Sequence, residues 1–171
     1  NSKSVIATIY GQVVAEDGTP IKGAVVQVGN SKFTTDSDGG FHFSKINTKQ
    51  TATLIEVSKA TYFNGYRTLS MNANKDHFTR IMLIEMKNAK QFNSISGGNV
   101  QVNGGGSINF PANSIVYKSN GTPYNGTVTV YNHWINPTDK NLNMLTPGAL
   151  RAVDAENNEK ILSTFGMIGV E

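Results

Sequence analysis

Apolar and polar residues alternate along much of the chain, which is the pattern of β-strands with one buried face. Ala24, Val26 and Val28 share one side of such a segment, while Gln27 and Gly29 lie on the other. Clusters of Gly, Asn, Asp and Pro separate these segments and favour turns. Up to residue 87 we expect seven strands, at 10–14, 24–29, around Phe33, and at 41–43, 52–58, 67–71 and 78–86.

The last of these segments is apolar on both faces. Phe78 and Met82 share one side with Arg80, whereas Ile81 and Leu83 lie on the other. Such a segment favours a central or sandwich-edge strand over a helix. Seven short strands are enough for one small sandwich, so residues 1–87 are predicted to form a first domain.

The hydrophobic periodicity stops between Lys87 and Gln91, and glycine-rich segments then bracket shorter strands. We therefore predict a second, β-rich domain over 88–171, which would be truncated if further strands follow Glu171. A sheet edge left open at 167–170 is the alternative. Within this domain we expect strands near 100–102, 108–110, 128–134, 150–153 and 161–170, a Pro-punctuated loop over 136–147 and a hairpin turn at Asn157-Asn158.

The composition agrees with an all-β fold. Of the 171 residues 38% are apolar and 9% aromatic, which is enough for packed cores, and the 17 glycines favour many turns. Charged residues make up only 16%, and the net charge of +3 comes from scattered Lys and Arg. The charge pattern therefore argues against nucleic acid or a membrane surface as partner.

The chain has no cysteine, so neither disulfides nor thiolate metal sites hold the fold. No apolar run reaches the roughly 18 residues of a membrane-spanning helix. No signal peptide opens the sequence, and an exported form would already have lost its leader. The polar residues 1–4 would suit the end of a tether, with a lipid anchor upstream of Asn1.

Residues 11–62 contain, in order, a leading G-x-V, an acidic-Gly-x-Pro turn, a G-A-x-V-x-V strand, a T-T-D-x-D-G-x-F turn and a V-S-x-x-x-Y segment. This set of motifs resembles the carboxypeptidase regulatory-like domain, a small transthyretin-like β-sandwich of many secreted and surface proteins, particularly of Bacteroidetes. The resemblance implies a transthyretin-like or Ig-like sandwich for the seven predicted strands. Together with the pattern beyond residue 87, the expected fold is all-β, with this N-terminal seven-stranded sandwich followed by a second small β-domain. The family usually has Gly before its final Tyr, where this chain has Thr61. The matching residues are Gly11, Val13, Asp17, Gly18, Pro20, Gly23, Ala24, Val26, Val28, Thr35, Asp36, Asp38, Gly40, Phe41, Val57, Ser58 and Tyr62.

The second half contains three segments, over 105–116, 120–130 and 165–170, that read GGSINFPANSIV, NGTPYNGTVTV and FGMIGV. These segments are similar to the β-domain shared by tight-junction scaffold proteins and netrin receptors. Such domains are interaction modules, which implies a binding role rather than a catalytic one.

Asp36 and Asp38 stand where a calcium loop would begin, but the later glutamate of such a loop is missing. An Asx turn, in which these carboxylates accept backbone N–H bonds, is the favoured interpretation. A calcium ion bound by Asp36 and Asp38 with loop carbonyls is the alternative, and we expect no other cofactor or metal.

No catalytic motif is present in the sequence. His42, His77 and His133 lack the spacing that places two imidazoles on one helical face. Neither a nucleophile elbow nor a Ser-x-x-Lys motif in its expected context occurs. We therefore expect no enzymatic activity and no catalytic residue.

Two aromatic groups are candidate binding residues. Aromatic rings beside amide or carboxylate groups suit sugar rings or the surface of a protein partner. The alternative for Tyr131 and Trp134 is packing in the second core. The candidates are Tyr62, Tyr66, Tyr131, Trp134, Asn136 and Asp139.

These observations favour a non-catalytic structural or interaction module of the bacterial cell surface, outer membrane or extracellular space, engaged in adhesion or surface assembly. A carbohydrate-binding module is one alternative, and an accessory domain of a larger peptidase is another. The expected partner is a protein or a glycan at the cell surface.

Overall fold

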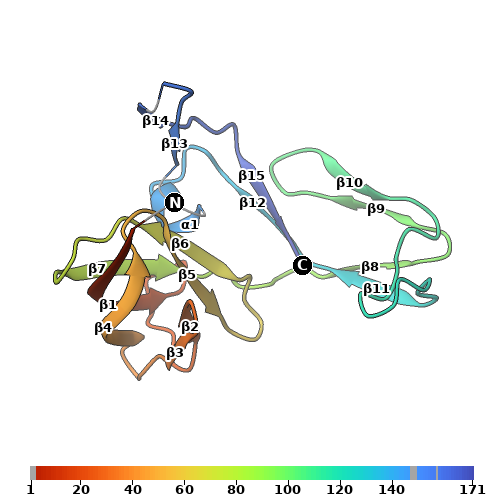
Figure 1. Ribbon diagram of the computed structural model, residues 1–171. Helices are drawn as coiled ribbons and strands as arrows, with labels where there is room; N and C mark the ends of the chain where they lie inside the picture. Colours follow the sequence, from red (N-terminus) through yellow and green to blue (C-terminus); the bar gives the residue numbers. More distant parts are fainter. Residues whose placement is uncertain (1–2, 147–149, 157) are drawn as a thin grey trace. The chain divides into compact units, whose positions relative to one another are not determined.

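The computed structural model describes residues 3–146, 150–156 and 158–171, and most of these lie in strands or in the turns that join them (Figure 1). The described chain contains fifteen strands and one four-residue helix, which confirms the all-β class. No helix among these residues has the length and apolar character needed to cross a membrane.

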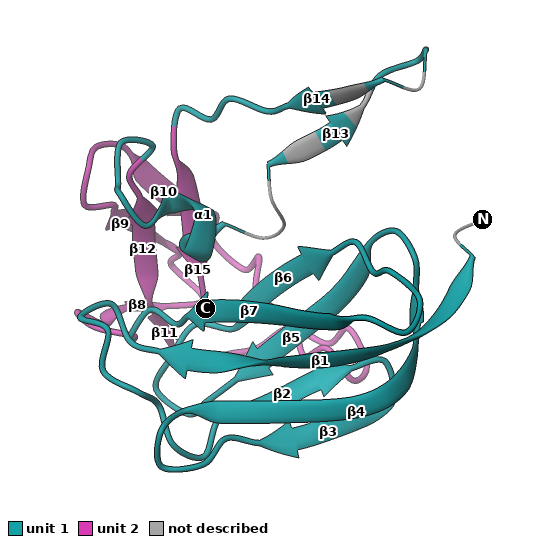
Figure 2. Ribbon diagram, turned by 90° about the vertical axis from the view of Figure 1, so that its left-hand side faces the viewer, with its two compact units in different colours: residues 1–85, 137–165 teal, residues 86–136, 166–171 magenta. Residues whose placement is uncertain are grey.

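The chain divides into two compact units, coloured separately in Figure 2. The first comprises residues 1–85 and 137–165, and the second comprises 86–136 and 166–171. The division into domains at residue 87 stays a prediction.

The first seven strands form the two sheets of a sandwich, as predicted. A three-stranded sheet has the order β4-β1-β7 and faces the viewer in Figure 2, and a four-stranded sheet has the order β3-β2-β5-β6. All neighbouring pairs are antiparallel except β1 and β7, which are parallel. The strands are β1 (Ser4–Val14), β2 (Val25–Val28), β3 (Ser31–Thr34), β4 (Gly40–Lys49), β5 (Thr53–Ser58), β6 (Gly65–Leu69) and β7 (Asp76–Met82).

The core lies between these two sheets and follows from the alternation in the sequence. In β5, Ile55 and Val57 point inward and are at most 1% exposed, whereas Leu54 points outward. Burial of such branched side chains is the main favourable contribution to folding. The fully or nearly buried core also contains Val5, Ala7, Ile9, Val13, Ile21, Ala24, Val26, Val28, Phe41, Phe43, Met71, Ile81 and Leu83.

Thr35 is a buried polar residue that joins two segments of the sandwich. Its hydroxyl accepts a hydrogen bond from the backbone N–H of Ala24 at 2.8 Å and donates one to the carbonyl of Ile21 at 2.6 Å. Both hydrogen-bonding capacities of the buried hydroxyl are therefore used.

Residues 137–165 belong to the first unit and contain two further strands and the helix. The helix α1 (Leu142–Leu145) lies in the segment predicted as a loop, because Asp139 starts a single turn too short to show helical periodicity. The guanidinium of Arg67 in β6 donates to the carbonyl of Asn143, and burial lowers the pKa of Arg67. β13 (Arg151–Val153) pairs with β14 (Glu159–Ile161) in a hairpin. The hairpin turn was predicted at Asn157-Asn158, where Asn157 lies outside the described residues.

The second unit consists of three antiparallel strand pairs, namely β8 with β11, β9 with β10 and β12 with β15. The rings of Phe92 and Phe110 stack with centroids 4.8 Å apart. Among the described residues β15 has β12 as its single strand partner, and the alternatives of a truncated domain and of an open edge at 167–170 both stay predictions. The bounds are β8 (Lys90–Asn93), β9 (Gly98–Gln101), β10 (Ser107–Phe110), β11 (Thr127–Val130), β12 (Asn132–Ile135) and β15 (Met167–Val170).

Candidate functional site

The two candidate tyrosines of the first unit lie in different environments. Tyr62 is half-buried and packs against the sandwich core, and its backbone pairs with Glu85. Tyr66 is 40% exposed and points outward from β6, where Glu56 is its neighbour across the strand pair. The structure therefore does not bring these two rings together on one surface.

Trp134 lies in a packed environment within the second unit. A Cβ atom built at Gly104 would lie 2.2 Å from Cε3 of the indole, and one at Gly166 would lie 2.5 Å from its Nε1. The indole thus packs directly against two glycine backbones. Tyr131 exchanges two backbone hydrogen bonds with Glu171, at 2.8 and 3.0 Å. These contacts favour the packing alternative for Trp134, while a binding role stays a prediction.

The remaining two candidates belong to different units. Asn136 lies in the second unit, whereas Asp139 lies in the first. The Asp139 carboxylate accepts a hydrogen bond from the backbone N–H of Asn141 at 2.7 Å. The backbone carbonyl of Asp139 accepts one from the N–H of Leu142 at 3.0 Å. Asp139 therefore has a local structural role at the start of α1.

Asp36 makes the predicted Asx turn. Its Oδ1 accepts the backbone N–H groups of Asp38 at 2.9 Å and Gly40 at 2.7 Å. The backbone carbonyl of Asp38, in turn, accepts a hydrogen bond from the side-chain amide of Gln12 at 2.8 Å. Within the described residues no group of three His, Asp or Glu side chains is placed to hold a metal ion.

The outer face of the three-stranded sheet exposes an aromatic pair that the sequence interpretation missed. Tyr10 in β1 and Phe78 in β7 are direct neighbours across the parallel pair, and their ring centroids lie 5.5 Å apart at an interplanar angle of 57°. Tyr10 is 40% exposed and Phe78 is 57% exposed. His42 in β4 is the neighbour of Tyr10 on the other side, so the three residues form a row across the sheet.

Polar side chains lie in the rows on either side of this aromatic row. Gln12 and Arg80 are neighbours in the next row toward the end of β1. On the other side, Thr8 is the neighbour of Asp76, and its hydroxyl accepts the backbone N–H of Lys45 at 3.4 Å. We call this outer surface, formed by Thr8, Tyr10, Gln12, His42, Lys45, Asp76, Phe78 and Arg80, the aromatic face.

The aromatic face is a consequence of strand alternation. In β1, Ile9 and Val13 point into the core, and Tyr10 must therefore point outward. In β7, Thr79 and Ile81 point inward, which leaves Phe78 outside. Two large aromatic side chains thus lie next to each other in solvent, although each could have been a polar residue without loss of the core.

The outer face of the four-stranded sheet is mainly polar, and two hollows lie beside it, the larger of which is lined in part by residues of β1 and β4. Lys32, Gln27, Glu56 and Tyr66 form a row across its four strands. Gln27 and Glu56 line both hollows, and Tyr66 lines only the smaller one, of about 140 Å³. The larger hollow, of about 530 Å³, is also lined by Ser4, Val28, Gly29, Asn47, Thr48, Lys49, Ala52, Thr53 and Leu54.

Comparison with known proteins gives no family assignment. No family model matches the chain, and no curated protein matches it. The resemblances to the carboxypeptidase regulatory-like domain and to the second β-domain therefore stay predictions.

Several solved structures are distantly similar. A cohesin–X-dockerin complex from Acetivibrio cellulolyticus is 18% identical over 47% of this chain and 58% of that chain, with a TM-score of 0.39. A protein of unknown function described as membrane-associated, from Bacteroides fragilis, is 18% identical over 47% of this chain and 29% of that chain, with a TM-score of 0.35. A Bacteroides uniformis protein, named for a proposed carbohydrate-binding role, is 6% identical over 96% and 78% of the two chains, with a TM-score of 0.36. Similarity at this distance carries no information about a ligand.

Proposed function

We propose that this protein is a non-catalytic interaction module of the bacterial cell surface that binds a carbohydrate chain on the aromatic face. The exposed pair of Tyr10 and Phe78 carries the proposal. The location at the cell surface rests on the resemblance of residues 11–62 to domains of secreted and surface proteins.

Exposure of the two rings to water is unfavourable in free energy, and a surface with a purely structural role could carry polar side chains instead. Large apolar side chains that lie together in water mark interaction sites more often than single exposed residues do. Tyr is favoured at such sites because it combines a large apolar surface with a hydroxyl group. A sugar ring complements both properties, because its C–H faces are apolar and its rim carries hydroxyl groups.

Hydrogen-bonding groups lie beside the rings on the same face. The amide nitrogen of Gln12 donates to the carbonyl of Asp38, which fixes the orientation of this side chain next to the aromatic row. His42 and the Tyr10 hydroxyl add groups that can donate or accept. Rings that stack on a sugar and polar groups that bind its hydroxyls would together give orientation and specificity.

The test is binding of the full chain to a panel of polysaccharides and oligosaccharides, first on a glycan array and then by isothermal titration calorimetry. Tyr10→Ala and Phe78→Ala should each weaken binding about tenfold, which corresponds to about 1.4 kcal/mol. Circular dichroism of each variant checks that the sandwich is folded.

Tyr66→Ala is the matched control, because Tyr66 has the same exposure as Tyr10 but lies on the opposite sheet. We expect it to bind glycans like the unmodified chain. Loss of binding in Tyr66→Ala alone would move the site to the polar face of the four-stranded sheet. Absence of binding to any glycan would refute the proposed function.

A further inference from the structure

We infer that the aromatic face selects anionic glycans, whose sugars carry carboxylate or sulfate groups, over neutral ones. This inference rests on the proposed function and specifies the class of ligand for the same site. Its basis is the distribution of charged side chains around Tyr10 and Phe78.

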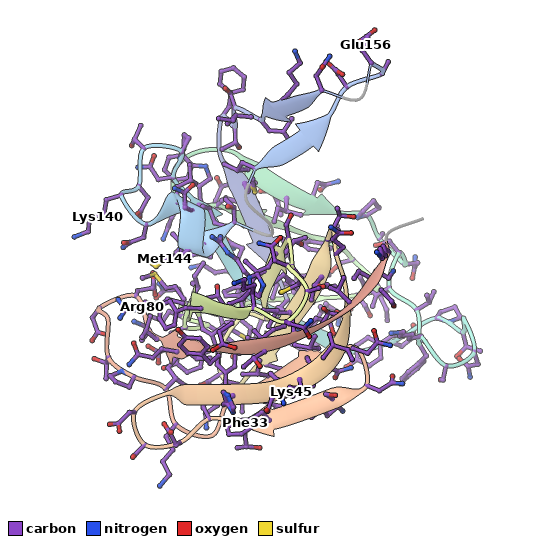
Figure 3. The ribbon with its side chains drawn as sticks, turned by 60° about the vertical axis from the view of Figure 1, so that its left-hand side comes forward. Phe33, Lys45, Arg80, Lys140, Met144 and Glu156 are labelled. Atoms are coloured by element: carbon purple, nitrogen blue, oxygen red, sulfur yellow. The ribbon has the colours of Figure 1, made fainter. Side chains whose placement is uncertain are left out.

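Cationic side chains lie on both sides of the aromatic row. Arg80 follows Phe78 by two residues on the same face of β7, which places it about 7 Å further along the strand. Lys45 lies on β4 near Thr8, one row away on the other side. Figure 3 shows Lys45 and Arg80 well separated on this side of the sandwich. A glycan stacked on the rings would therefore extend toward a cation in either direction.

The charge balance differs between the two outer faces. On the three-stranded sheet, Lys45 and Arg80 stand against one carboxylate, that of Asp76. The row across the four-stranded sheet contains one cation and one carboxylate, those of Lys32 and Glu56. The excess of positive charge is thus found on the face with the exposed aromatic pair.

The two cations can contribute in different ways. The guanidinium of Arg80 presents several N–H groups in a plane and can bind a carboxylate or sulfate through two hydrogen bonds. The ammonium of Lys45 acts as a point charge on a flexible stem. Because both side chains are exposed, their attraction to an anionic ligand should weaken as salt screens it.

A few cations around two rings favour a glycan over a single-stranded nucleic acid. Proteins that bind single strands combine stacking rings with a positively charged groove that follows the phosphates. The aromatic face is not a continuous basic groove, and Asp76 lies within it. Its polar residues instead include Gln12, His42 and Thr8, which suit sugar hydroxyls.

The experiment compares binding of the full chain to polygalacturonate, dextran sulfate and unmodified dextran, with single-stranded DNA as a fourth probe. Affinity should be at least about tenfold higher for the anionic glycans than for dextran at about 50 mM salt, and the difference should shrink at about 200 mM. Arg80→Gln and Lys45→Gln should each weaken binding to the anionic glycans about twofold to fivefold more than they weaken binding to dextran.

Three controls separate selective binding from general attraction of charge. Lys32→Gln removes a cation from the opposite face and should leave every affinity unchanged. Tyr10→Ala and Phe78→Ala should weaken binding to the anionic glycans as well as to dextran. Preference for polygalacturonate or for dextran sulfate would identify carboxylate or sulfate as the recognised group, and either result supports the inference.

The outcomes that overturn the inference differ from those that overturn the proposed function. Equal affinity for neutral and anionic glycans, unchanged in Arg80→Gln and Lys45→Gln, would refute anionic selection and leave glycan binding intact. Binding to none of the glycans would refute both. Tighter binding to single-stranded DNA than to any glycan would also refute both and identify the face as a nucleic-acid surface.

Discussion

The backbone of Gly11 in β1 lies so close to Thr79 in β7 that a Cβ atom at position 11 would stand 1.9 Å from the Thr79 carbonyl oxygen. The ring of Phe41 covers the same position, with its Cζ atom 2.7 Å from that Cβ. Any side chain here would push apart strands that pair on both sides of β1. We expect Gly11→Ala to lower the free energy of unfolding of the first unit by about 3 kcal/mol, measured by urea denaturation followed by circular dichroism.

Gly29→Ala provides the comparison for this variant. Gly29 has a φ of 56°, and nothing lies within 4 Å of a Cβ atom built there, so only backbone strain of about 1 kcal/mol is expected. A Gly11→Ala protein as stable as Gly29→Ala would contradict the close approach of β1 and β7.

The buried hydroxyl of Thr35 gives a second prediction. Thr35→Val keeps the shape of the side chain but removes the hydrogen bonds to the Ala24 N–H and the Ile21 carbonyl. We expect a loss of about 1–3 kcal/mol in the free energy of unfolding, because both backbone groups lose this partner in the buried interior. Thr34→Val, at the exposed neighbouring position, should change stability by less than about 0.5 kcal/mol, and equal effects of the two variants would argue against this role.

Gly104 and Gly105 form a matched pair that tests the packing of Trp134. Both have positive φ, 103° and 112°, so replacement by Ala strains the backbone at either position. Only at Gly104 would the new Cβ atom meet the indole, because nothing lies within 4 Å at Gly105. We expect Gly104→Ala to destabilise the second unit by about 1–3 kcal/mol more than Gly105→Ala does.

Trp134 is the only tryptophan of the chain, so its fluorescence reports directly on this packing. Urea denaturation followed by tryptophan fluorescence is the measurement for both variants. Superimposable transitions for Gly104→Ala and Gly105→Ala would show that the indole is not packed against this loop.

The stability of the β13–β14 hairpin should depend on pH through the carboxyl group of Asp154. The backbone N–H of Asn158, 2.8 Å from Oδ1, is the main cause that lowers the pKa of this carboxyl, and Lys160 at 3.3 Å also lowers it. Because the folded pKa lies below the ordinary value of 3.8, the contribution to stability is fully present above that value. It is lost as the pH falls through the folded pKa.

NMR titration of the Asp154 carboxyl carbon and of the Asn158 amide measures this effect. We expect the Asp154 midpoint below 3.8 and a parallel loss of protection of the Asn158 amide from hydrogen exchange. In Asp154→Asn the amide protection should no longer change over this pH range. An Asp154 midpoint at or above the ordinary value would show that the contacts with Asn158 and Lys160 do not lower the pKa of this carboxyl.

The strands of the first unit could be predicted from the sequence because their pattern is local. Alternation in 24–29 and 52–58 determines which side chains are buried, and the Asp36 turn depends on residues within four positions of it. The helix α1 could not be predicted, since its single turn depends on Asp139 and on the carbonyl of Asn143 meeting Arg67, far away in the sequence.

The aromatic face could not be found in the same way. Tyr10 and Phe78 are separated by most of the sandwich in sequence and become neighbours only through the parallel pairing of β1 and β7. Period-two alternation places each ring on the face of its strand that is opposite to the buried residues, but it does not tell which strands are adjacent. Trp134 attracted attention as a lone tryptophan, although the residues that pack against it, Gly104 and Gly166, are distant glycines without any aromatic signal.

The parallel pairing of β1 with β7 also has a consequence for synthesis of the chain. β1 is the central strand of its sheet, yet one of its two partners begins at Asp76. While only the first half of this unit has emerged from the ribosome, the backbone N–H and C=O groups on one side of β1 therefore have no partner and can pair with other strands. The sheet can be completed only when β7 has been synthesised as far as residue 82. Because pairing of β7 with β1 closes a long loop, this pairing should be slow and should give chaperones a defined interval in which to act.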